Sequence, residues 1–395
     1  MSCGLTGATM KFNPVLARLT PYRGGLSLAD IRKRYELKHI AIMSANEVPW
    51  GPFPEVVEAL RSAVAGLNRY PDGTCAELRG VLAGQLGVSE ANLCFGNGSC
   101  ELLMLLGQAL LTENDHAVFP HPSFVMYRSI VLARGGPFSA VPLNRLDYDL
   151  DDILQAVRPE TSVVIICNPN NPTGSYIEPE RLRAFIEGVP KETAIILDEA
   201  YGEFVTSPAR EETAAWVAEY PNLVVLRTFS KIYGLAGLRL GYGIADPEIV
   251  QALDKLRQPF NVDSLAQIAA RESLRYPDRL SERRDRIAAE RLRLSAALAD
   301  AGIRCHPSEA NFLLVDVTGL AVPGPEVSQA LLERGILTRS GYAMDCPGWI
   351  RVTIGDAEEG DVFLSAMREL IHGIAQGGAL RSGWAADAES ISPES

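Results

Sequence analysis

The sequence predicts an α/β protein with a mainly parallel sheet, and two observations carry this prediction. Between residues 91 and 244, short apolar runs alternate with longer amphipathic stretches. The runs also lack polar alternation, which is typical of strands buried on both faces of a parallel sheet that helices cover on either side. The candidate strands are residues 92–95, 117–119, 163–167, 194–197, 223–226 and 240–244.

The pattern changes after residue 268, where a long charged helical stretch begins. A strand over 311–315 follows, and helix and strand alternate again through 332–337 and 349–354, which predicts a second, smaller α+β domain. The expected divisions are an N-terminal arm packing with the small domain (1–45, otherwise irregular), a large domain (46–268), a small domain (269–375) and a disordered tail rich in Gly, Ser and Ala (376–395).

Composition narrows the class of protein. The 395-residue chain has a formal net charge of −12, which argues against a nucleic-acid partner. Its one basic cluster, residues 283–293, is interleaved with acidic residues and predicts a solvated helix face. Seven scattered cysteines and five histidines form no ligand spacing, so no metal site is expected. No apolar run reaches the ~18 residues of a membrane span, and the N-terminus lacks a basic stretch followed by an apolar core, which favours a cytoplasmic protein without a membrane partner.

Polar residues follow three of the candidate strands. Residues 168–174 come after the strand at 163–167, residues 198–201 follow the strand at 194–197, and residues 227–239 follow the strand at 223–226. Ligands bind beyond the carboxyl ends of strands in such sheets, so an amide, a carboxylate, a phenol, hydroxyls, a lysine and an arginine are expected in one crevice.

Pyridoxal 5′-phosphate requires this set of groups. A lysine forms an imine with its aldehyde, and desolvation beside cationic groups keeps that amine deprotonated. A carboxylate holds the pyridine nitrogen protonated so that the ring withdraws electrons. An amide and a phenol hydrogen-bond the ring oxygen, while hydroxyls, an arginine and helix-start amides hold the phosphate.

Taken together, these segments resemble the fold-type I pyridoxal-phosphate aminotransferases and, within them, the histidinol-phosphate aminotransferase family, over residues 22–371. The resemblance implies a large domain with a mainly parallel seven-stranded sheet flanked by helices. It makes Lys231 the Schiff-base lysine and Asp198 the partner of the pyridine nitrogen. Asn171 and Tyr201 are the implied ring-oxygen partners. The implied phosphate-binding residues are Thr228, Ser230 and Arg239.

Further segments extend the resemblance and show two departures. The family's phosphate-cradling turn matches Ser99, Cys100 and Glu101. Cys100 stands where aspartate is usual, although backbone amides can still serve there. Phe124 matches the residue that stacks on the cofactor ring and replaces the usual tyrosine, so a hydroxyl is lost. Tyr70 matches the residue that reaches the neighbouring subunit's phosphate, which implies a homodimer with shared active sites.

The substrate side is implied by resemblance alone. Tyr22 matches a contact to the substrate phosphate, and Asn46 lies in another family-like segment. Arg351 matches the family's anion clamp, with Arg339 as a second clamp. Bidentate guanidinium groups accept either a phosphate or a carboxylate.

The sequence therefore predicts a ping-pong aminotransferase that takes a small-molecule amino donor and a 2-oxo acid acceptor. The first candidate reaction is histidinol-phosphate:2-oxoglutarate transamination in histidine biosynthesis. The alternatives are an aromatic or specialised biosynthetic amino-acid aminotransferase, a threonine-phosphate decarboxylase-like enzyme and a non-enzymatic ligand-binding regulator. A nicotinamide site is disfavoured, because the turn at 96–101 lacks the third glycine of a dinucleotide fingerprint.

Overall fold

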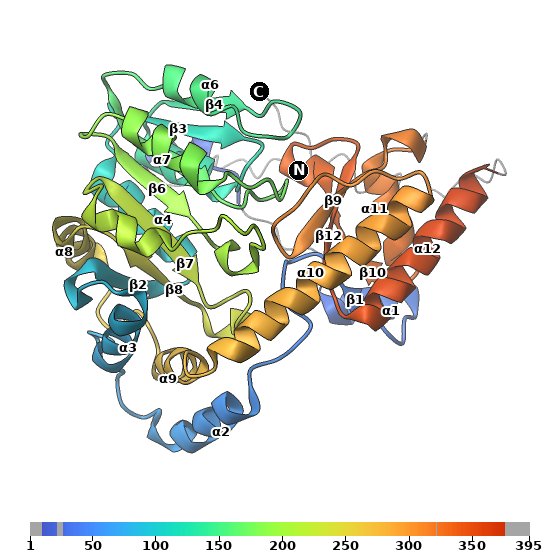
Figure 1. The fold of residues 1–395 in the computed structure, drawn as a ribbon, viewed down its shortest axis with the longest axis horizontal. Coiled ribbons are helices and arrows are strands. Elements are labelled where there is room, and N and C mark those ends of the chain that lie inside the picture. Colours follow the sequence, from blue (N-terminus) through green and yellow to red (C-terminus); the bar gives the residue numbers. More distant parts are fainter. Residues whose placement is uncertain (1–9, 22–26, 321, 376–395) are drawn as a thin grey trace.

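The computed structural model describes residues 10–21, 27–320 and 322–375, and a seven-stranded sheet dominates it (Figure 1). Strand β8 runs antiparallel to both of its neighbours, β2 and β7, while the other strand pairs are parallel. The predicted α/β class and the mainly parallel sheet are confirmed. In spatial order the strands are β2 (Leu93–Asn97), β8 (Leu240–Ile244), β7 (Leu223–Thr228), β6 (Ala194–Asp198), β5 (Thr161–Cys167), β3 (His116–His121) and β4 (Phe138–Pro142).

Helices cover both faces of this sheet, which explains the unbroken apolar runs. Successive side chains of a strand point to opposite faces, so Val163 and Ile165 enter one core cluster while Val164 and Ile166 enter the other. Strand β4 was missed by the sequence prediction, because this short edge strand is only partly buried and ends in a proline.

Between β2 and β6, α-helices separate the successive strands along the chain. Helix α4 follows β2 and α5 follows β3, and both pack on the same core cluster. The helices of the larger lobe are α2 (Pro54–Ala63), α3 (Ala76–Leu86), α4 (Ser99–Leu110), α5 (Met126–Arg134), α6 (Leu150–Gln155), α7 (Pro179–Gly188), α8 (Pro247–Leu256) and α9 (Ser264–Ser273).

A smaller lobe contains a three-stranded antiparallel sheet in the order β11, β12, β9 (Figure 1). The long helix α10 leads from the larger lobe into it. The elements of this lobe are α10 (Pro277–Asp300), β9 (Phe312–Asp316), α11 (Gly324–Leu332), β10 (Ile336–Leu337), β11 (Arg339–Ser340), β12 (Trp349–Thr353) and α12 (Ala357–Ala375).

The N-terminal segment contacts both lobes. Strand β1 (Ala41–Ile42) pairs in parallel with β10, and Gln329 donates a hydrogen bond to the Tyr35 hydroxyl at the end of α1 (Leu28–Tyr35). The 3₁₀ helix η1 (Pro14–Arg18) instead lies against α5, where Arg18 donates to the Gly135 carbonyl over 2.8 Å. The expectation of irregular structure before residue 45 was wrong for α1, whose N-cap is Ser27.

The basic cluster on α10 is less solvated than the sequence predicted. Arg283 and Arg291 are only 7% and 5% exposed, so the predicted solvated face is wrong at these two positions. Their guanidinium groups donate to backbone carbonyls, Arg283 to Ile232 and Arg291 to Ala310. Long side chains on a charged helix thus anchor neighbouring loops. No helix within the described ranges is long and apolar enough to cross a membrane.

Candidate active site

The polar segments that follow β5, β6 and β7 meet at one edge of the large sheet. The three strands are adjacent and parallel, so their carboxyl ends lie side by side. Asp198 ends β6, Thr228 ends β7, and Asn171 follows β5, and all three are at least nine-tenths buried. The polar groups expected at this edge therefore lie together, and the region between them and the facing residues Ala45 and Arg351 is called the crevice below.

Lys231 lies in this crevice, three residues beyond the end of β7. Its Nζ donates a hydrogen bond to the Ala45 carbonyl over 3.1 Å and lies 5.5 Å from the centre of the Tyr201 ring. Desolvation, followed by the positive charge of Arg351, lowers the pKa of Lys231 to about 8. A substantial fraction of the amine is thus neutral and nucleophilic near pH 8.

Asp198 is held by two hydrogen bonds. Its Oδ2 accepts from the Tyr127 hydroxyl at 2.8 Å and its Oδ1 accepts from the Ala200 amide at 3.1 Å. Burial raises the pKa of Asp198 to about 6, although both of these donors and the charge of Lys231 oppose the rise. Sequence reasoning did not single out Tyr127. Its position three residues after Phe124 in the same family-like segment was the available signal.

Asn171 and Tyr201 are both oriented by residues from the other side of the crevice. Arg351 Nη1 donates to Asn171 Oδ1, which leaves the Asn171 amide nitrogen to donate elsewhere. The Tyr201 hydroxyl accepts from Asn46 Nδ2 at 2.9 Å, so its own proton is also free to point toward a ligand. Both groups are thereby set up as donors.

A cradle for an anion lies at the start of helix α4. Gly98 is the N-cap residue, and its φ of 77° is a conformation that favours glycine. A Cβ there would come within 2.5 Å of Arg239 Nη2, so the guanidinium lies directly beside the helix N-terminus. Arg239 Nη1 donates to the Ser230 hydroxyl over 3.3 Å, and the Ser230 amide donates to Thr228 Oγ1 over 3.1 Å.

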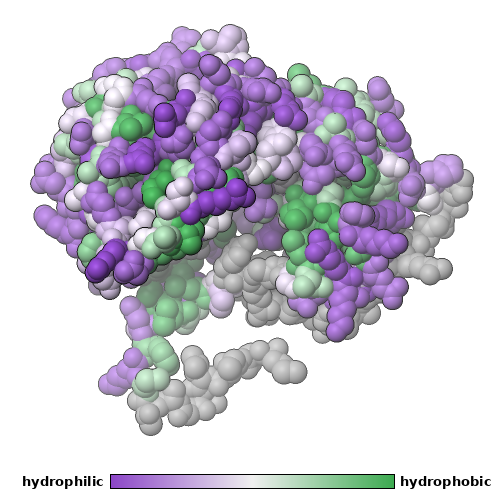
Figure 2. All heavy atoms as spheres, turned by 90° about the horizontal axis from the view of Figure 1, so that it is seen from below, coloured by the Kyte–Doolittle hydropathy of each residue, from purple (hydrophilic) through white to green (hydrophobic). Residues whose placement is uncertain are grey.

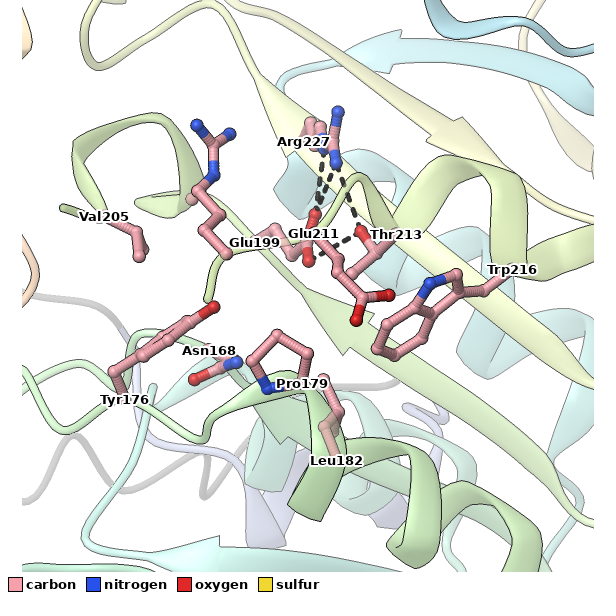
Figure 3. A pocket seen from close by; sticks show the side chains of 12 residues that line it. Asn168, Tyr176, Pro179, Leu182, Glu199, Val205, Glu211, Thr213, Trp216 and Arg227 are labelled. Atoms are coloured by element: carbon pink, nitrogen blue, oxygen red, sulfur yellow. Dashed lines mark hydrogen bonds and ion pairs between the residues drawn. The ribbon is translucent and has the colours of Figure 1, made fainter. Parts of the chain in front are cut away.

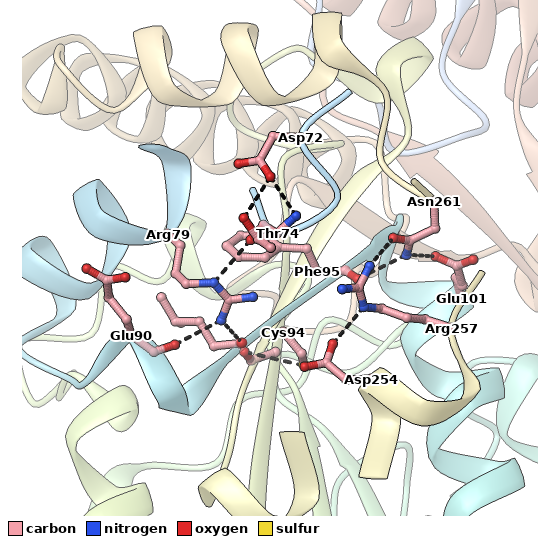
Figure 4. A network of polar contacts seen from close by, with 12 residues as sticks. Asp72, Thr74, Arg79, Glu90, Cys94, Phe95, Glu101, Asp254, Arg257 and Asn261 are labelled. Carbon is pink, nitrogen blue, oxygen red and sulfur yellow. Dashed lines mark hydrogen bonds and ion pairs between the residues drawn. The ribbon is translucent and has the colours of Figure 1, made fainter. Parts of the chain in front are cut away.

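Of the three residues predicted in this turn, Ser99 and Cys100 begin α4, and Glu101 has other partners. Burial, followed by the charge of Asp198, raises the pKa of the Cys100 thiol. Glu101 Oε2 accepts from the Asn97 amide at 2.6 Å and from Asn261 Nδ2 at 2.8 Å. Figure 4 shows Glu101 within a polar network that continues through Asn261 to Arg257, which is a structural position.

A buried ion pair between Arg227 and Glu199 lies next to the site. Arg227 and Glu199 directly neighbour Thr228 and Asp198 in sequence, and their side chains meet with Arg227 Nε donating to Glu199 Oε2 over 2.9 Å (Figure 3). The Thr213 hydroxyl donates to the other Glu199 oxygen over 2.7 Å. The adjoining cavity, of about 20 Å³, has room for about one water molecule and contains none of the predicted site residues. This pair fixes the ends of β6 and β7.

The predicted substrate residues come from the smaller lobe and the segment before α2. Arg339 and Arg351 are paired neighbours across β11 and β12. Arg351 is 8% exposed, and its Nη2 donates to the Ser44 carbonyl over 2.7 Å. Asn46, 1% exposed, accepts from the Thr353 hydroxyl. Tyr22 lies outside the described residues.

The two predicted aromatic contacts are placed differently. Phe124 is partly buried and meets Tyr127 edge to face, with ring centres 5.8 Å apart. Tyr70 is 83% exposed and stacks on Phe260 at 4.8 Å. Among the residues that the structure describes, no group of three or more His, Cys, Asp or Glu side chains could hold a metal ion.

Comparison with known proteins shows the family to which this chain belongs. The sequence model described as "Aminotransferase class I and II" matches residues 38–367. The chain belongs to the class I and II aminotransferase family. A histidinol-phosphate aminotransferase from Brevibacillus brevis is 40% identical over 89% of this chain and 96% of its own length. Another, from a Geobacillus species, is 38% identical over 92% and 98%.

Solved aminotransferases share the fold. The crystal structure of histidinol-phosphate aminotransferase from Sinorhizobium meliloti, in complex with pyridoxal-5′-phosphate, superposes with a TM-score of 0.84 and 31% identity, over 93% of this chain and 99% of that one. An aspartate aminotransferase from Thermus thermophilus has a TM-score of 0.80 at 21% identity, over 91% and 100% of the two chains. The second likeness concerns the fold alone.

Proposed function

We propose that this aminotransferase binds pyridoxal 5′-phosphate through Lys231 and exchanges the amino group of histidinol phosphate with 2-oxoglutarate, in histidine biosynthesis. The observation that carries the proposal is the convergence of Lys231, Asp198 and the α4 cradle at one sheet edge, beside paired arginines. The names of the similar proteins supply the substrate.

The residues present fit the cofactor. The start of α4 with Ser99 and Cys100, together with Arg239, offers amide groups and a positive charge to a phosphate. Ser230 and Thr228 supply hydroxyls next to this cradle. Asp198 would face the pyridine nitrogen, Asn171 and Tyr201 the ring oxygen, and Phe124 the ring face. We assign Glu101 to holding the turn, because Asn97 and Asn261 both donate to its Oε2.

In the proposed chemistry, Lys231 moves a proton at the substrate Cα and Asp198 keeps the pyridine nitrogen protonated. When bound, the cofactor supplies a ring that stabilises negative charge on the substrate Cα. Lys231, with its pKa lowered to about 8, accepts the proton from that Cα as a general base. Asp198 stays ionised at neutral pH because Tyr127 and Ala200 donate to it. Its charge then favours a protonated pyridine nitrogen.

Two arginines are suited to the two anions of the proposed reaction. Histidinol phosphate carries a phosphate and 2-oxoglutarate carries carboxylates, and a guanidinium forks onto either. Arg351 and Arg339 lie side by side on β12 and β11, with Arg351 close enough to lower the pKa of Lys231. We propose them as the anion clamp, joined by Asn46 and by Tyr22 from outside the described residues.

Single-turnover absorbance measurements test the substrate assignment. The cofactor-loaded enzyme is mixed with histidinol phosphate or with phenylalanine, and loss of the visible cofactor band is followed. Rapid loss with histidinol phosphate alone supports the proposal. Loss with phenylalanine alone assigns the chain to aromatic amino-acid transamination instead. If the enzyme instead releases CO₂ from threonine phosphate, its activity is decarboxylation and not transamination.

We further propose a homodimer that shares its active sites. The support is the exposure of four large apolar or aromatic side chains, Tyr70, Phe260, Val64 and Leu67, which are each at least 44% exposed, and the stacking of Tyr70 on Phe260. Figure 2 views the molecule from the side on which α2 lies in Figure 1, and hydrophobic residues are exposed there among hydrophilic ones. Tyr70 would extend from its exposed position to the partner's phosphate. Sedimentation at micromolar concentration should give twice the mass of one chain, and a monomer would contradict the proposal.

The proposal also covers the roles of the two lobes and the location of the enzyme. We propose that residues 46–268 hold the cofactor and that residues 269–375, with the N-terminal arm, close over the substrate. The six described cysteines are all free, which supports a cytoplasmic enzyme.

A further inference from the structure

The hydroxyl of Tyr127 is dedicated to one oxygen of Asp198. Tyr127 has no exposed surface, and its hydroxyl donates to Asp198 Oδ2 over 2.8 Å. The same residue is the second of α5, and its amide donates to the Phe124 carbonyl over 3.1 Å. Tyr127 therefore connects the carboxylate at the end of β6 with the aromatic residue assigned to the cofactor's ring face.

The donor role of Tyr127 is fixed by its surroundings. Burial, then the charge of Asp198, raises the pKa of Tyr127 well above its ordinary value, so the phenol keeps its proton throughout the working range. A buried carboxylate loses stability without donors, because the low-dielectric surroundings penalise its charge. A charge-assisted hydrogen bond is about twice as strong as a neutral one.

Few other groups can keep Asp198 ionised. On its own segment Glu199 opposes ionisation and the Ala200 amide favours it, and Lys231 after β7 also favours it. The remaining titratable neighbours are neutral when Asp198 is charged, namely Cys100 on α4, Cys167 on β5, Tyr148 and Tyr201. Tyr127 is thus the one side chain that the structure shows donating a hydrogen bond to this carboxylate among the described residues.

We infer that Tyr127 is a positioning residue that keeps Asp198 oriented and ionised, and through it sets the protonation of the cofactor's pyridine nitrogen. This inference rests on the proposed cofactor site. Each carboxylate oxygen has two lone pairs, so Asp198 can accept from Tyr127 and Ala200 and still accept from the ring nitrogen. Phe124, assigned to ring stacking, and Tyr127, which donates to Asp198, are in contact at the start of α5. The same short segment therefore positions both residues.

The test compares Tyr127→Phe with the matched control Tyr148→Phe. Tyr148 is also a buried tyrosine, but its hydroxyl donates to the Cys167 carbonyl. Each protein is loaded with pyridoxal phosphate carrying ¹⁵N in the ring, and the nitrogen chemical shift is recorded between about pH 6 and 9. The dissociation constant of the cofactor is measured in parallel, with circular dichroism of the unloaded proteins as a folding control.

In Tyr127→Phe the pKa of the ring nitrogen should fall by about one unit, and the cofactor should bind about tenfold more weakly. Tyr148→Phe should leave the nitrogen shift unchanged. An unchanged nitrogen titration in Tyr127→Phe, or equal changes in both variants, would overturn the inference, because Tyr127 would then matter only for packing. Failure of the wild-type protein to bind the cofactor at all would instead refute the proposed function.

Discussion

The two sides of the crevice are built in different ways. The cofactor side is formed by the ends of adjacent strands in one buried sheet, which carry Asp198 and Thr228 and lead to Asn171. The substrate side is formed by Arg351 on β12 of the smaller sheet, by Arg339 on the two-residue edge strand β11 and by the segment before α2, and Arg351 donates to Ser44, which is 307 residues away in the chain. One large sheet positions the first set, while contacts between distant segments bring the second set together.

This difference separates reaction type from substrate choice. Asp198 ends β6 and cannot move without breaking strand hydrogen bonds, and Lys231 lies three residues beyond β7, so both are suited to a chemistry that stays the same. The short strand β11 and the segment before α2 depend on how the lobes pack, and such regions vary with less cost to the fold. Substitutions on the two sides should therefore fail in different ways.

The largest expected effect is on the cofactor side. Lys231→Ala should abolish covalent capture of the cofactor and reduce turnover by at least about 10⁴-fold, since both the nucleophile and the general base are lost. The measurement is the visible absorbance of the purified protein together with its activity. Lys191→Ala, at an exposed position, is the control and should behave as wild type. A yellow, active Lys231→Ala protein would exclude the lysine assignment.

Arg351→Lys should produce a smaller loss and a different kind of loss. Lysine keeps the charge but lacks the planar fork that donates from Nη1 to Asn171 and from Nη2 to Ser44, so kcat/KM for both substrates should fall by about 10- to 100-fold. Cofactor absorbance should persist, which separates this variant from Lys231→Ala. Arg368→Lys, on an exposed position of α12, serves as the control in steady-state assays. Unchanged kinetics would remove Arg351 from the clamp.

The cofactor side could be predicted because its residues follow apolar runs. Lys231, Asp198 and Asn171 each come after a strand that the sequence marks clearly, and the rule for parallel sheets then brings the strand ends together. Most of the large sheet was predictable for the same reason. Strand β4 was not, because a partly exposed edge strand of five residues gives no long apolar run.

Contacts made across the chain could not be predicted in this way. The bond from Tyr127 to Asp198 spans 71 positions and depends on where α5 begins relative to β6. Asn46 adopts a φ of 56°, which its own sequence does not indicate. The burial of Arg283 depends on a loop supplying the Ile232 carbonyl, whereas charge patterning alone suggested a solvated helix. Each of these features depends on packing between segments that are distant in sequence.

The rate of cofactor capture should follow the titration of the Lys231 amine. Its pKa is lowered from 10.5 to about 8, so the neutral fraction rises about tenfold per pH unit below 8 and then levels off. Stopped-flow absorbance of the unloaded protein mixed with pyridoxal phosphate should show this profile. A rate still rising steeply at pH 9 to 10 would mean that Lys231 titrates like an exposed lysine and lacks the desolvation that the crevice provides.

The smallest effect is expected for Arg339→Lys. Arg339 is only partly buried and lies on an edge strand of two residues, so the lost guanidinium fork should raise KM by less than about tenfold and leave kcat near wild type. Steady-state kinetics with histidinol phosphate and with 2-oxoglutarate measure the change for each anion. A loss equal to that of Arg351→Lys would make the two arginines equivalent, and specificity would then depend on the β11–β12 pair as a unit. A loss for one substrate alone would show that Arg339 distinguishes the phosphate from the carboxylate.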